Sequence, residues 1–307
     1  MTKRRASTAK AGWTPAWLFA ALAFLGSSMA YTTANAADSA ATAVLRAKYG
    51  VLQEQLQHNQ FQRPLYMESG ETSESVKGDV YALIKHPFAT TAASLSKSAQ
   101  WCDIMMLHIN TKFCRASSNS GSDHLQVNIG KKYDQAVEDA YKVKFSYRVV
   151  SNAPDYLKVM LTADAGPLST RDYQVVLEAI PLANNQTFIH LIYSYGFGTA
   201  GRLAMQTYLG TIGSSKMGFT VVSKQSQGEP NYIGGMRGLV ERNTMRYYLA
   251  IEAFLGALST PPPAQLERRL YDWFAFSEQY PRQLRELKQN EYLDMKRREF
   301  ARMKEHV

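Results

Sequence analysis

A long amphipathic helix near the C-terminal end most constrains how this chain can fold. The segment from Met236 to Leu258 repeats apolar residues at helical spacing, and residues 261–263 are all proline. Proline cannot continue a helix, so the predicted helix has about six turns at roughly 3.6 residues per turn. Its apolar face consists of Leu239, Val240, Tyr247, Tyr248, Ile251, Leu255 and Leu258. We expect the charged residues Arg237, Glu241, Arg242, Arg246 and Glu252 to lie mostly away from that face.

A series of β-type segments precedes this helix. Turn residues such as 151–154 and 183–185 separate them, and most of these connections are too short for crossover helices. The spacing therefore predicts an antiparallel meander. Its segments are Leu125–Ile129, Ala140–Val150, Tyr156–Ala163, Tyr173–Pro181 and Thr187–Gly196. A partly apolar helical insert follows Gly201, and Met217–Ser223 is predicted as a last strand.

Four elements are expected before the meander. Leu65–Ser69 is a short strand candidate, and Lys77–His86 alternates like a strand that ends at a proline. Phe88–Asp103 has the apolar markers of a helix, and Ile104–Cys114 has the pattern of a buried strand. On that strand His108 and Asn110 would share one face.

The N-terminus has the pattern of an export signal. A basic stretch from Lys3 to Lys10 precedes the apolar run Trp17–Leu25, and residues 34–36 fit the small-x-small cleavage rule. We therefore expect a periplasmic protein whose mature chain begins at Ala37. The apolar run is shorter than the about 20 residues of a membrane span, and an uncleaved N-terminal anchor is the alternative.

The charge balance limits the possible partners. Removing residues 1–36 takes away four basic and no acidic side chains, so the formal net charge falls from +9 to +5. This mild excess suits contact with anionic lipid head groups. It is too small to indicate nucleic-acid binding, and we predict none.

The chain has two cysteines, Cys102 and Cys114. In an oxidising compartment such a pair is most simply a disulfide. Closing a loop of about a dozen residues is worth about 3 kcal/mol on the chain-entropy model. A metal pair or a reactive thiol is the alternative. His108 is the one histidine between the cysteines and no four-ligand spacing occurs, so we predict no metal site.

The sequence divides into four parts. We expect a signal peptide at 1–36, an N-terminal helical segment at 37–64, a main domain at 65–260 and a charged helical tail at 261–307. The tail has two possible roles. It packs back on the domain as a solvated helix, or it forms a basic amphipathic arm that touches a membrane surface or a partner.

The order strand, helix, antiparallel strands and long C-terminal helix resembles the START-like or Bet v 1-like superfamily, also called SRPBCC. The resemblance covers about residues 65–258. Three short segments add to the order of the elements, namely Gly78-Asp79-Val80-Tyr81, Trp101-Cys102 and Arg246-Tyr247-Tyr248-Leu249. It implies an α+β helix-grip fold, in which a curved antiparallel sheet wraps around the last helix. That fold would enclose a tunnel for a hydrophobic ligand such as a lipid or sterol. The export signal, the inserted helix and both tails depart from a minimal member.

Catalytic motifs are absent from the sequence. There is no nucleophile elbow, phosphate-binding glycine loop or metal-binding histidine motif, so we predict neither catalysis nor a cofactor. The candidate ligand contacts are His86, His108, Asn110, Tyr147, Tyr193, Tyr195, Arg246 and Tyr247. Histidine suits a polar anchor or general base, and tyrosine suits a cavity wall.

Arg246 is the best candidate for a head-group contact, since no acid lies three or four residues away on its helix. Each candidate also has a structural alternative. The histidines can be structural, Arg246 can be solvated or pair with another element, and the tyrosines can fill a core.

Three functions follow from these observations. The first is periplasmic binding or transfer of a hydrophobic, lipid-like ligand, with residues 200–213 as a movable lid. The second is a cyclase- or hydrolase-type enzyme on the same fold that uses His86 or His108. The third is a cell-envelope interaction protein whose terminal helices hold a partner. The sequence determines neither the ligand's identity nor the oligomeric state.

Overall fold

The computed structural model describes residues 1–2, 21–119, 122–211, 216–224 and 228–305, with side chains in the first helix described from Asp38 onward. The basic start of the predicted signal and residues 17–20 of its apolar run lie outside the described residues. Within the described part, no helix is both long and apolar enough to cross a bilayer.

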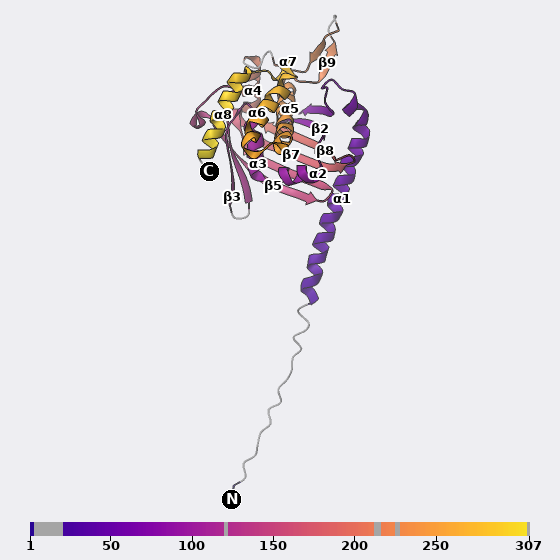
Figure 1. The fold of residues 1–307 in the computed structure, drawn as a ribbon. Helices are drawn as coiled ribbons and strands as arrows, with labels where there is room; N and C mark the ends of the chain where they lie inside the picture. Colours follow the sequence, from indigo (N-terminus) through magenta and orange to yellow (C-terminus); the bar gives the residue numbers. More distant parts are fainter. Residues whose placement is uncertain (3–20, 120–121, 212–215, 225–227, 306–307) are drawn as a thin grey trace.

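An eight-stranded sheet in the order β1-β2-β8-β7-β6-β5-β4-β3 forms the centre of the fold (Figure 1). Each neighbouring pair is antiparallel, as the meander predicts. The strands are β1 (Leu65–Glu71), β2 (Ser75–Ile84), β3 (Thr111–Asn119), β4 (Ser122–Ile129), β5 (Tyr141–Ala153), β6 (Tyr156–Ala165), β7 (Thr170–Leu182) and β8 (Gln186–Phe197). The sheet thus contains the five predicted meander strands and three more.

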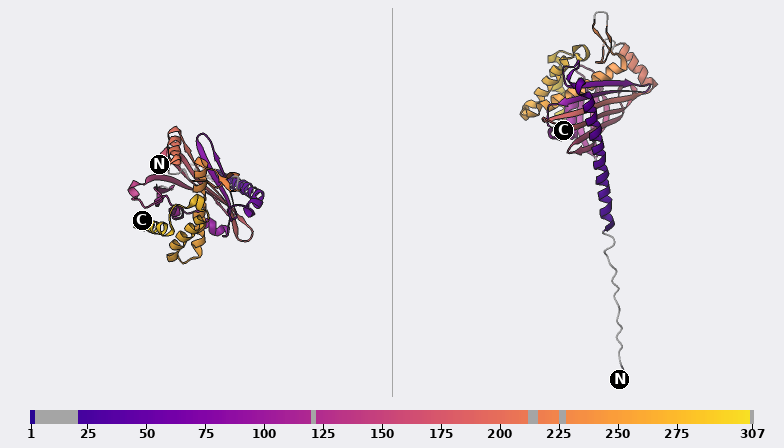
Figure 2. Two further views of the ribbon diagram at one scale, coloured as in Figure 1. Left: turned by 90° about the horizontal axis from the view of Figure 1, so that it is seen from above. Right: turned by 90° about the vertical axis from the view of Figure 1, so that its right-hand side faces the viewer.

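Helices cover both faces of this sheet. The α-helices are α1 (Ala21–Gln57), α2 (Phe88–Leu95), α3 (Ser98–Leu107), α4 (Thr199–Gly210), α5 (Gly235–Gly256), α6 (Pro262–Glu278), α7 (Pro281–Leu284) and α8 (Gln289–Glu305). Seen from above, the sheet separates α1 from α5 and the C-terminal helices (Figure 2). The helix α5 packs on β1, β2 and β8 and on the helices α3 and α6. This arrangement confirms the predicted α+β helix-grip fold.

Alternation along the strands determines which residues face α5. In β8, Ile189, Leu191 and Tyr193 are buried in the main core, whereas Phe188 belongs to a second cluster on the opposite face. Successive side chains of a strand point to opposite faces. Both faces of β8 are apolar because helices lie on each side of the sheet.

The surroundings of α5 differ from the predicted one-sided packing. Its charged residues Glu241, Arg242 and Arg246 are all buried. They are covered because α3, α4, α6 and α7 pack against the helix in addition to the sheet. A helix enclosed on every side must find partners for its charges inside the protein.

The prediction of a strand at Ile104–Cys114 is wrong over its first half. The helix α3 continues to Leu107, and β3 begins only at Thr111. Ile104 to Leu107 are all buried. A continuous apolar run of this kind does not distinguish a strand from a buried helix. His108 and Asn110 therefore lie in the α3–β3 turn.

The predicted last strand, Met217–Ser223, does not join the main sheet. Its end forms β9 (Val221–Lys224), which pairs with β10 (Pro230–Tyr232) in a separate hairpin. The backbone N–H groups of Phe219 and Thr220 instead donate to Oε2 of Glu241, at 2.5 and 2.9 Å. The Glu241 carboxylate thus accepts hydrogen bonds from backbone N–H groups that would otherwise donate to a neighbouring strand.

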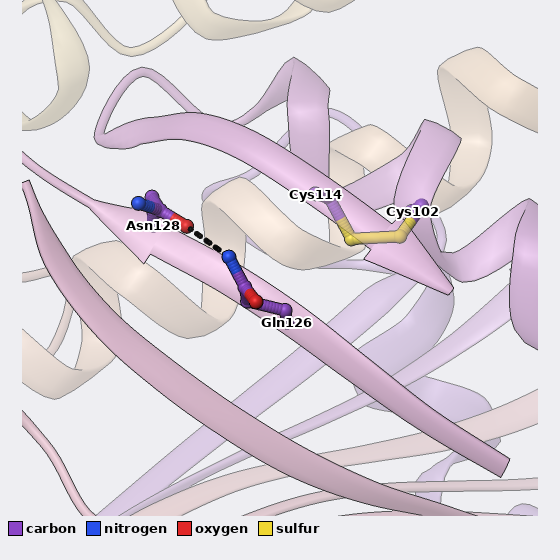
Figure 3. The surroundings of a disulfide bond; sticks show 4 residues. All are labelled: Cys102, Cys114, Gln126 and Asn128. Atoms are coloured by element: carbon purple, nitrogen blue, oxygen red, sulfur yellow. Dashed lines mark hydrogen bonds between the residues drawn. A yellow bond between two sulfur atoms is a disulfide. The ribbon is translucent and has the colours of Figure 1, made fainter. Parts of the chain in front are cut away.

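The predicted disulfide is present between Cys102 and Cys114. It joins α3 to β3 (Figure 3). Beside it on β4, Nε2 of Gln126 donates to Oδ1 of Asn128 at 3.3 Å. The bridge spans the turn that carries His108, so it restrains that turn at both ends.

The N-terminal helix packs on the outer face of the sheet. Leu45, Leu52 and Leu56 of α1 form a cluster with Tyr81 and Phe188 of the strands. All five side chains are buried. The part of α1 after the predicted cleavage site is therefore an integral cover of the sheet.

The C-terminal tail packs back on the domain, the first of its two predicted roles. Trp273 of α6 stacks on Tyr292 of α8 with ring centroids 4.8 Å apart. Beneath α8, Glu299 pairs with Lys112 of β3 at 2.9 Å and with Lys296 at 2.7 Å, and all three side chains are fully buried. Membrane contact by this tail stays a prediction.

Lys296 also ties α8 to the α3–β3 turn. Its Nζ donates to the carbonyl oxygens of His108 and Thr111, both at 2.8 Å. Burial and the neighbouring Lys112 lower the pKa of Lys296 to about 8, against the opposing effect of Glu299. The tail therefore holds the backbone of this turn in place.

A glycine permits the close approach of α5 to the sheet. A Cβ atom at Gly78 in β2 would lie 2.4 Å from Oγ1 of Thr244 on α5. That hydroxyl is held by donation to the carbonyl of Val240 at 2.8 Å. Any larger residue at position 78 would push the helix away.

We expect Gly78→Ala to lower the free energy of unfolding by about 1–3 kcal/mol, because overpacking at this contact forces the helix outward. Thr244→Ala in the same chain should restore part of the loss. Gly70→Ala is the matched control, since no atom lies within 4 Å of a Cβ there. Urea denaturation measures all three, and equal losses for Gly78→Ala and Gly70→Ala would contradict the assignment.

Candidate ligand-binding cavity

A cavity of about 640 Å³ lies between α5 and the rest of the domain. Its walls come from the α3–β3 turn, the segment 129–141, β7, β8, α4, α5 and the segment after α7. Three residues on its lining, Tyr133, Tyr141 and Leu168, are exposed at 57%, 44% and 46%. These residues mark where the cavity opens to the surface.

Tyrosines form one wall of the cavity. Tyr193 and Tyr195 are alternate residues of β8, so they project from the same face of the sheet. The ring of Tyr173 on β7 stacks on Tyr195 with centroids 5.2 Å apart, and Tyr247 of α5 lies 5.3 Å from Tyr193. Tyrosine supplies an apolar body and a polar tip. This wall can therefore contact apolar groups and still offer hydroxyls.

His108 lies at the C-terminal end of α3, with its ring 5.0 Å from that of Tyr247. Its Nδ1 accepts from the backbone N–H of Asn110 at 3.2 Å. Burial, together with the charges of Arg246 and Lys296, holds the pKa of His108 well below its ordinary value. The imidazole is therefore neutral at pH 7. Its Nε2 is buried and has no hydrogen-bond partner among the described residues.

Asn110 holds the turn against the neighbouring strand end. Its Nδ2 donates to the carbonyl of Gly130 at 2.7 Å, and the backbone of Gly130 donates to the carbonyl of Asn110, also at 2.7 Å. These reciprocal bonds place the turn beside the segment that follows β4. Asn110 therefore shapes the cavity lining as well as contributing to it.

Three cations share the carboxylate of Glu286. Its Oε1 accepts from Lys132 at 2.7 Å and from Arg246 at 3.0 Å, and its Oε2 pairs with Lys216 at 3.0 Å. Burial raises the pKa of Glu286, but Arg246 and Lys132 outweigh that effect, so the pKa lies below its ordinary value. Burial lowers the pKa of Lys132 to about 8 in spite of Glu286.

Arg242 lies one helical turn before Arg246 and is 1% exposed. Its Nη1 donates to the carbonyl of Met217 at 3.2 Å, whereas its Nε has no partner among the described residues. Burial and the charge of Arg246 lower the pKa of Arg242 to about 10. Arg242 therefore remains a buried cation at neutral pH.

The structure brings six of the eight predicted contact residues to this cavity. They are His108, Asn110, Tyr193, Tyr195, Arg246 and Tyr247. The other two lie elsewhere. His86 is half-buried after the end of β2, and its carbonyl accepts from Oγ1 of Thr187 at 2.8 Å. Tyr147 lines a separate hollow, and its hydroxyl donates to the carbonyl of Leu95 at 3.2 Å.

Four buried or half-buried charged residues of the cavity were not among the predicted contacts. They are Lys132, Lys216, Arg242 and Glu286. The one sequence signal is the spacing of Arg242 and Arg246, which places two arginines on the same face of the predicted helix. Glu286 follows α7, 40 residues after Arg246 in the chain, and no local pattern connects them.

No protein-family model and no curated protein matches this chain. Several solved structures do. Norcoclaurine synthase from Thalictrum flavum, in truncated form, is 11% identical over 47% of this chain and 91% of its own, with a TM-score of 0.33. The Zhui aromatase/cyclase from Streptomyces sp. R1128 is 9% identical over 48% and 88%, with a TM-score of 0.31.

CalU16 from Micromonospora echinospora is 9% identical over 70% of this chain and 96% of its own, with a TM-score of 0.28. With TM-scores below 0.5, these matches assign the chain to no superfamily. The helix-grip architecture rests on the sheet and the helix α5 described above. These likenesses do not extend to function.

We expect Glu286→Gln to lower the free energy of unfolding by about 3 kcal/mol at pH 7, because three buried or half-buried cations lose their shared carboxylate. The folded-state pKa of Glu286 is depressed, so its contribution is present above the unfolded value and disappears as pH falls through the folded one. The variant and the wild type should therefore converge in stability at strongly acidic pH.

Urea denaturation at pH 7 and at pH 3 measures this difference. Glu278→Gln is the control, since it breaks a pair whose Arg285 side chain is 58% exposed, and it should cost far less. A loss for Glu286→Gln no larger than the control's would show that the cluster does not depend on this carboxylate.

Proposed function

We propose that this protein binds a hydrophobic, lipid-like small molecule in the cavity between α5 and the sheet. The observation that carries the proposal is an interior space of about 640 Å³ bounded by aromatic side chains. Sites for small ligands have volumes of about 300–1,000 Å³ and apolar walls with a few polar groups. This cavity lies in that volume range, and it combines an aromatic wall with a charged one.

The unpaired polar atoms in the wall support binding over simple packing. Native interiors leave few voids larger than a water molecule, and their buried polar groups are bonded. Nε2 of His108 and the hydroxyl of Tyr195 are both buried without a partner among the described residues. A bound molecule would supply partners for both.

The insert α4 is the proposed movable side of the cavity. Met205 is buried and, with Tyr208, lines the space, whereas Leu203 on the same helix is 65% exposed. The helix is reached through Gly198, and Gly210 is its last residue. Displacing this one helix would widen the route to the tyrosine wall.

A cyclase- or hydrolase-type reaction is the second candidate function. The specific observation is the neutral His108 ring: its Nδ1 accepts from Asn110, so its Nε2 carries the ring proton and can donate a hydrogen bond to a developing negative charge. His108→Leu, which cannot donate, should then abolish turnover while leaving ligand affinity nearly unchanged. Loss of affinity alone would assign His108 to binding.

The binding proposal is tested with a neutral, apolar fluorophore, diphenylhexatriene, added to the purified mature protein. We expect saturable binding with one site per chain. Met205→Trp should weaken it at least tenfold, because the larger ring occupies the cavity. Leu203→Trp adds the same ring on the exposed side of α4 and should bind like the wild type.

Thermal unfolding of both variants controls for loss of structure. Two results would remove the proposal. One is the absence of saturable binding to the wild type, and the other is equal affinity in the two tryptophan variants.

We also propose that the protein is exported and that its signal is cleaved after Ala36. The sequence of residues 1–36 carries this proposal. Cleavage there leaves intact the part of α1 that contacts the sheet, since Leu45, Leu52 and Leu56 all follow it. The mature chain would therefore keep the complete fold.

N-terminal sequencing of the protein from the periplasmic fraction should give Ala37 as the first residue. Ala36→Leu places a large residue at the cleavage position and should leave the precursor uncleaved. Wild-type protein that keeps residues 1–36 and sediments with membranes would instead indicate an N-terminal anchor.

A further inference from the structure

The cavity contains more positive than negative charge. Four basic side chains on its lining approach the Glu286 region, namely Lys132, Lys216, Arg242 and Arg246. Glu286 pairs with three of them. The lining also includes one exposed residue of each sign, Asp139 and Lys131. The buried part therefore has several cations around one carboxylate.

Arg242 is the cation that this carboxylate does not reach by a hydrogen bond or ion pair in the described structure. It is 1% exposed, and its one hydrogen bond to a described residue is to the carbonyl of Met217. A buried guanidinium without an anion is costly. Among the described residues, Glu286 acts on Arg242 only through its charge, without an ion pair.

Arg246 faces the same space from the next turn of α5. Residues four apart on a helix lie side by side, and like charges at that spacing destabilise each other. Arg246 binds Glu286 through Nη2 and Asn243 through Nη1, at 3.0 and 3.4 Å. Its Nε, like that of Arg242, is buried and unpaired among the described residues. An anion placed between the two arginines would satisfy both.

A third free donor lies close by. The hydroxyl of Tyr195 is buried and has no partner in the described structure. Tyr195 and Arg242 line the same cavity, on elements that pack against each other. Two guanidinium Nε atoms and one phenol therefore offer hydrogen-bond donors from two facing elements, α5 and β8.

From this geometry we infer that the ligand is an amphiphile with one anionic head group, a carboxylate or a phosphate, bound by Arg242, Arg246 and Tyr195. Its apolar body lies along the tyrosine wall and Met205. The inference rests on the proposed function, because it names the ligand class of the same cavity. Charged hydrogen bonds to arginine are the strongest contacts available to such a head group.

Three ligands with the same oleoyl chain test the head group. Oleate carries a carboxylate, oleoyl lysophosphatidate a phosphate and monoolein no charge. Each is used below its aggregation threshold to displace diphenylhexatriene from the mature protein. We expect at least one of the two anions to compete at least tenfold more strongly than monoolein. The stronger of the two identifies the head group.

Two variants locate the anion site. Arg242→Gln should reduce competition by the preferred anion to the level of monoolein, with competition by monoolein unchanged. Tyr195→Phe removes only a hydroxyl that has no partner among the described residues, so it should fold normally and weaken anion binding several-fold. Arg115→Gln removes an exposed arginine of β3, outside the cavity, and should change nothing.

The outcomes separate the inference from the proposed function. Equal competition by all three ligands, or anion competition unaffected by both Arg242→Gln and Tyr195→Phe, overturns the anionic head group while ligand binding stands. Failure of diphenylhexatriene and of every oleoyl ligand to bind removes the proposed function itself.

Discussion

The close approach of α5 to β2 is the contact on which the rest of this structure depends. It occurs where Gly78 leaves room for Thr244, so the helix is seated at the β1–β2 side of the sheet. The cross-strand neighbour of Gly78 is Tyr193, whose ring contacts Tyr247 on the same helix. Gly78 on β2 thus determines where the helix packs on the sheet. Tyr193, its neighbour on β8, forms the adjacent edge of the cavity.

Burial of α5 on all sides explains the unusual charge distribution of the domain. A helix packed only on a sheet could direct its arginines into water. Here α6, α7 and α4 cover the opposite side, so Glu241 and Arg246 must bind groups from distant segments. Glu241 holds the backbone after Lys216, and Arg246 holds Glu286. The same enclosure leaves Arg242 and Arg246 buried on the wall of the cavity, where the inferred anionic ligand would meet them.

Much of the fold could be predicted because it rests on local periodicity. The meander strands alternate, and α5 repeats at helical spacing and ends at proline. The boundary between α3 and β3 could not be predicted. Ile104 to Leu107 are four consecutive apolar residues, and such a run has neither the period of a helix nor that of a strand. Arg246 and Tyr193 were predictable from residue type and position. The roles of Lys132 and Glu286 were not, because charged loop residues are ordinarily solvated and only tertiary contact places these two together.

The buried group Lys112, Glu299 and Lys296 has a consequence for how this molecule opens. It fastens α8 to the backbone of His108 and Thr111, which also belongs to the cavity wall. Removing one member would leave a buried charge without its partner. Moving α8 away from the domain would therefore expose Lys112, Lys296 and Glu299 at the same time. The tail therefore restrains the part of the cavity wall that carries His108 and Thr111. This restraint supports the proposal that a ligand enters on the α4 side, because the histidine side is held by buried ion pairs.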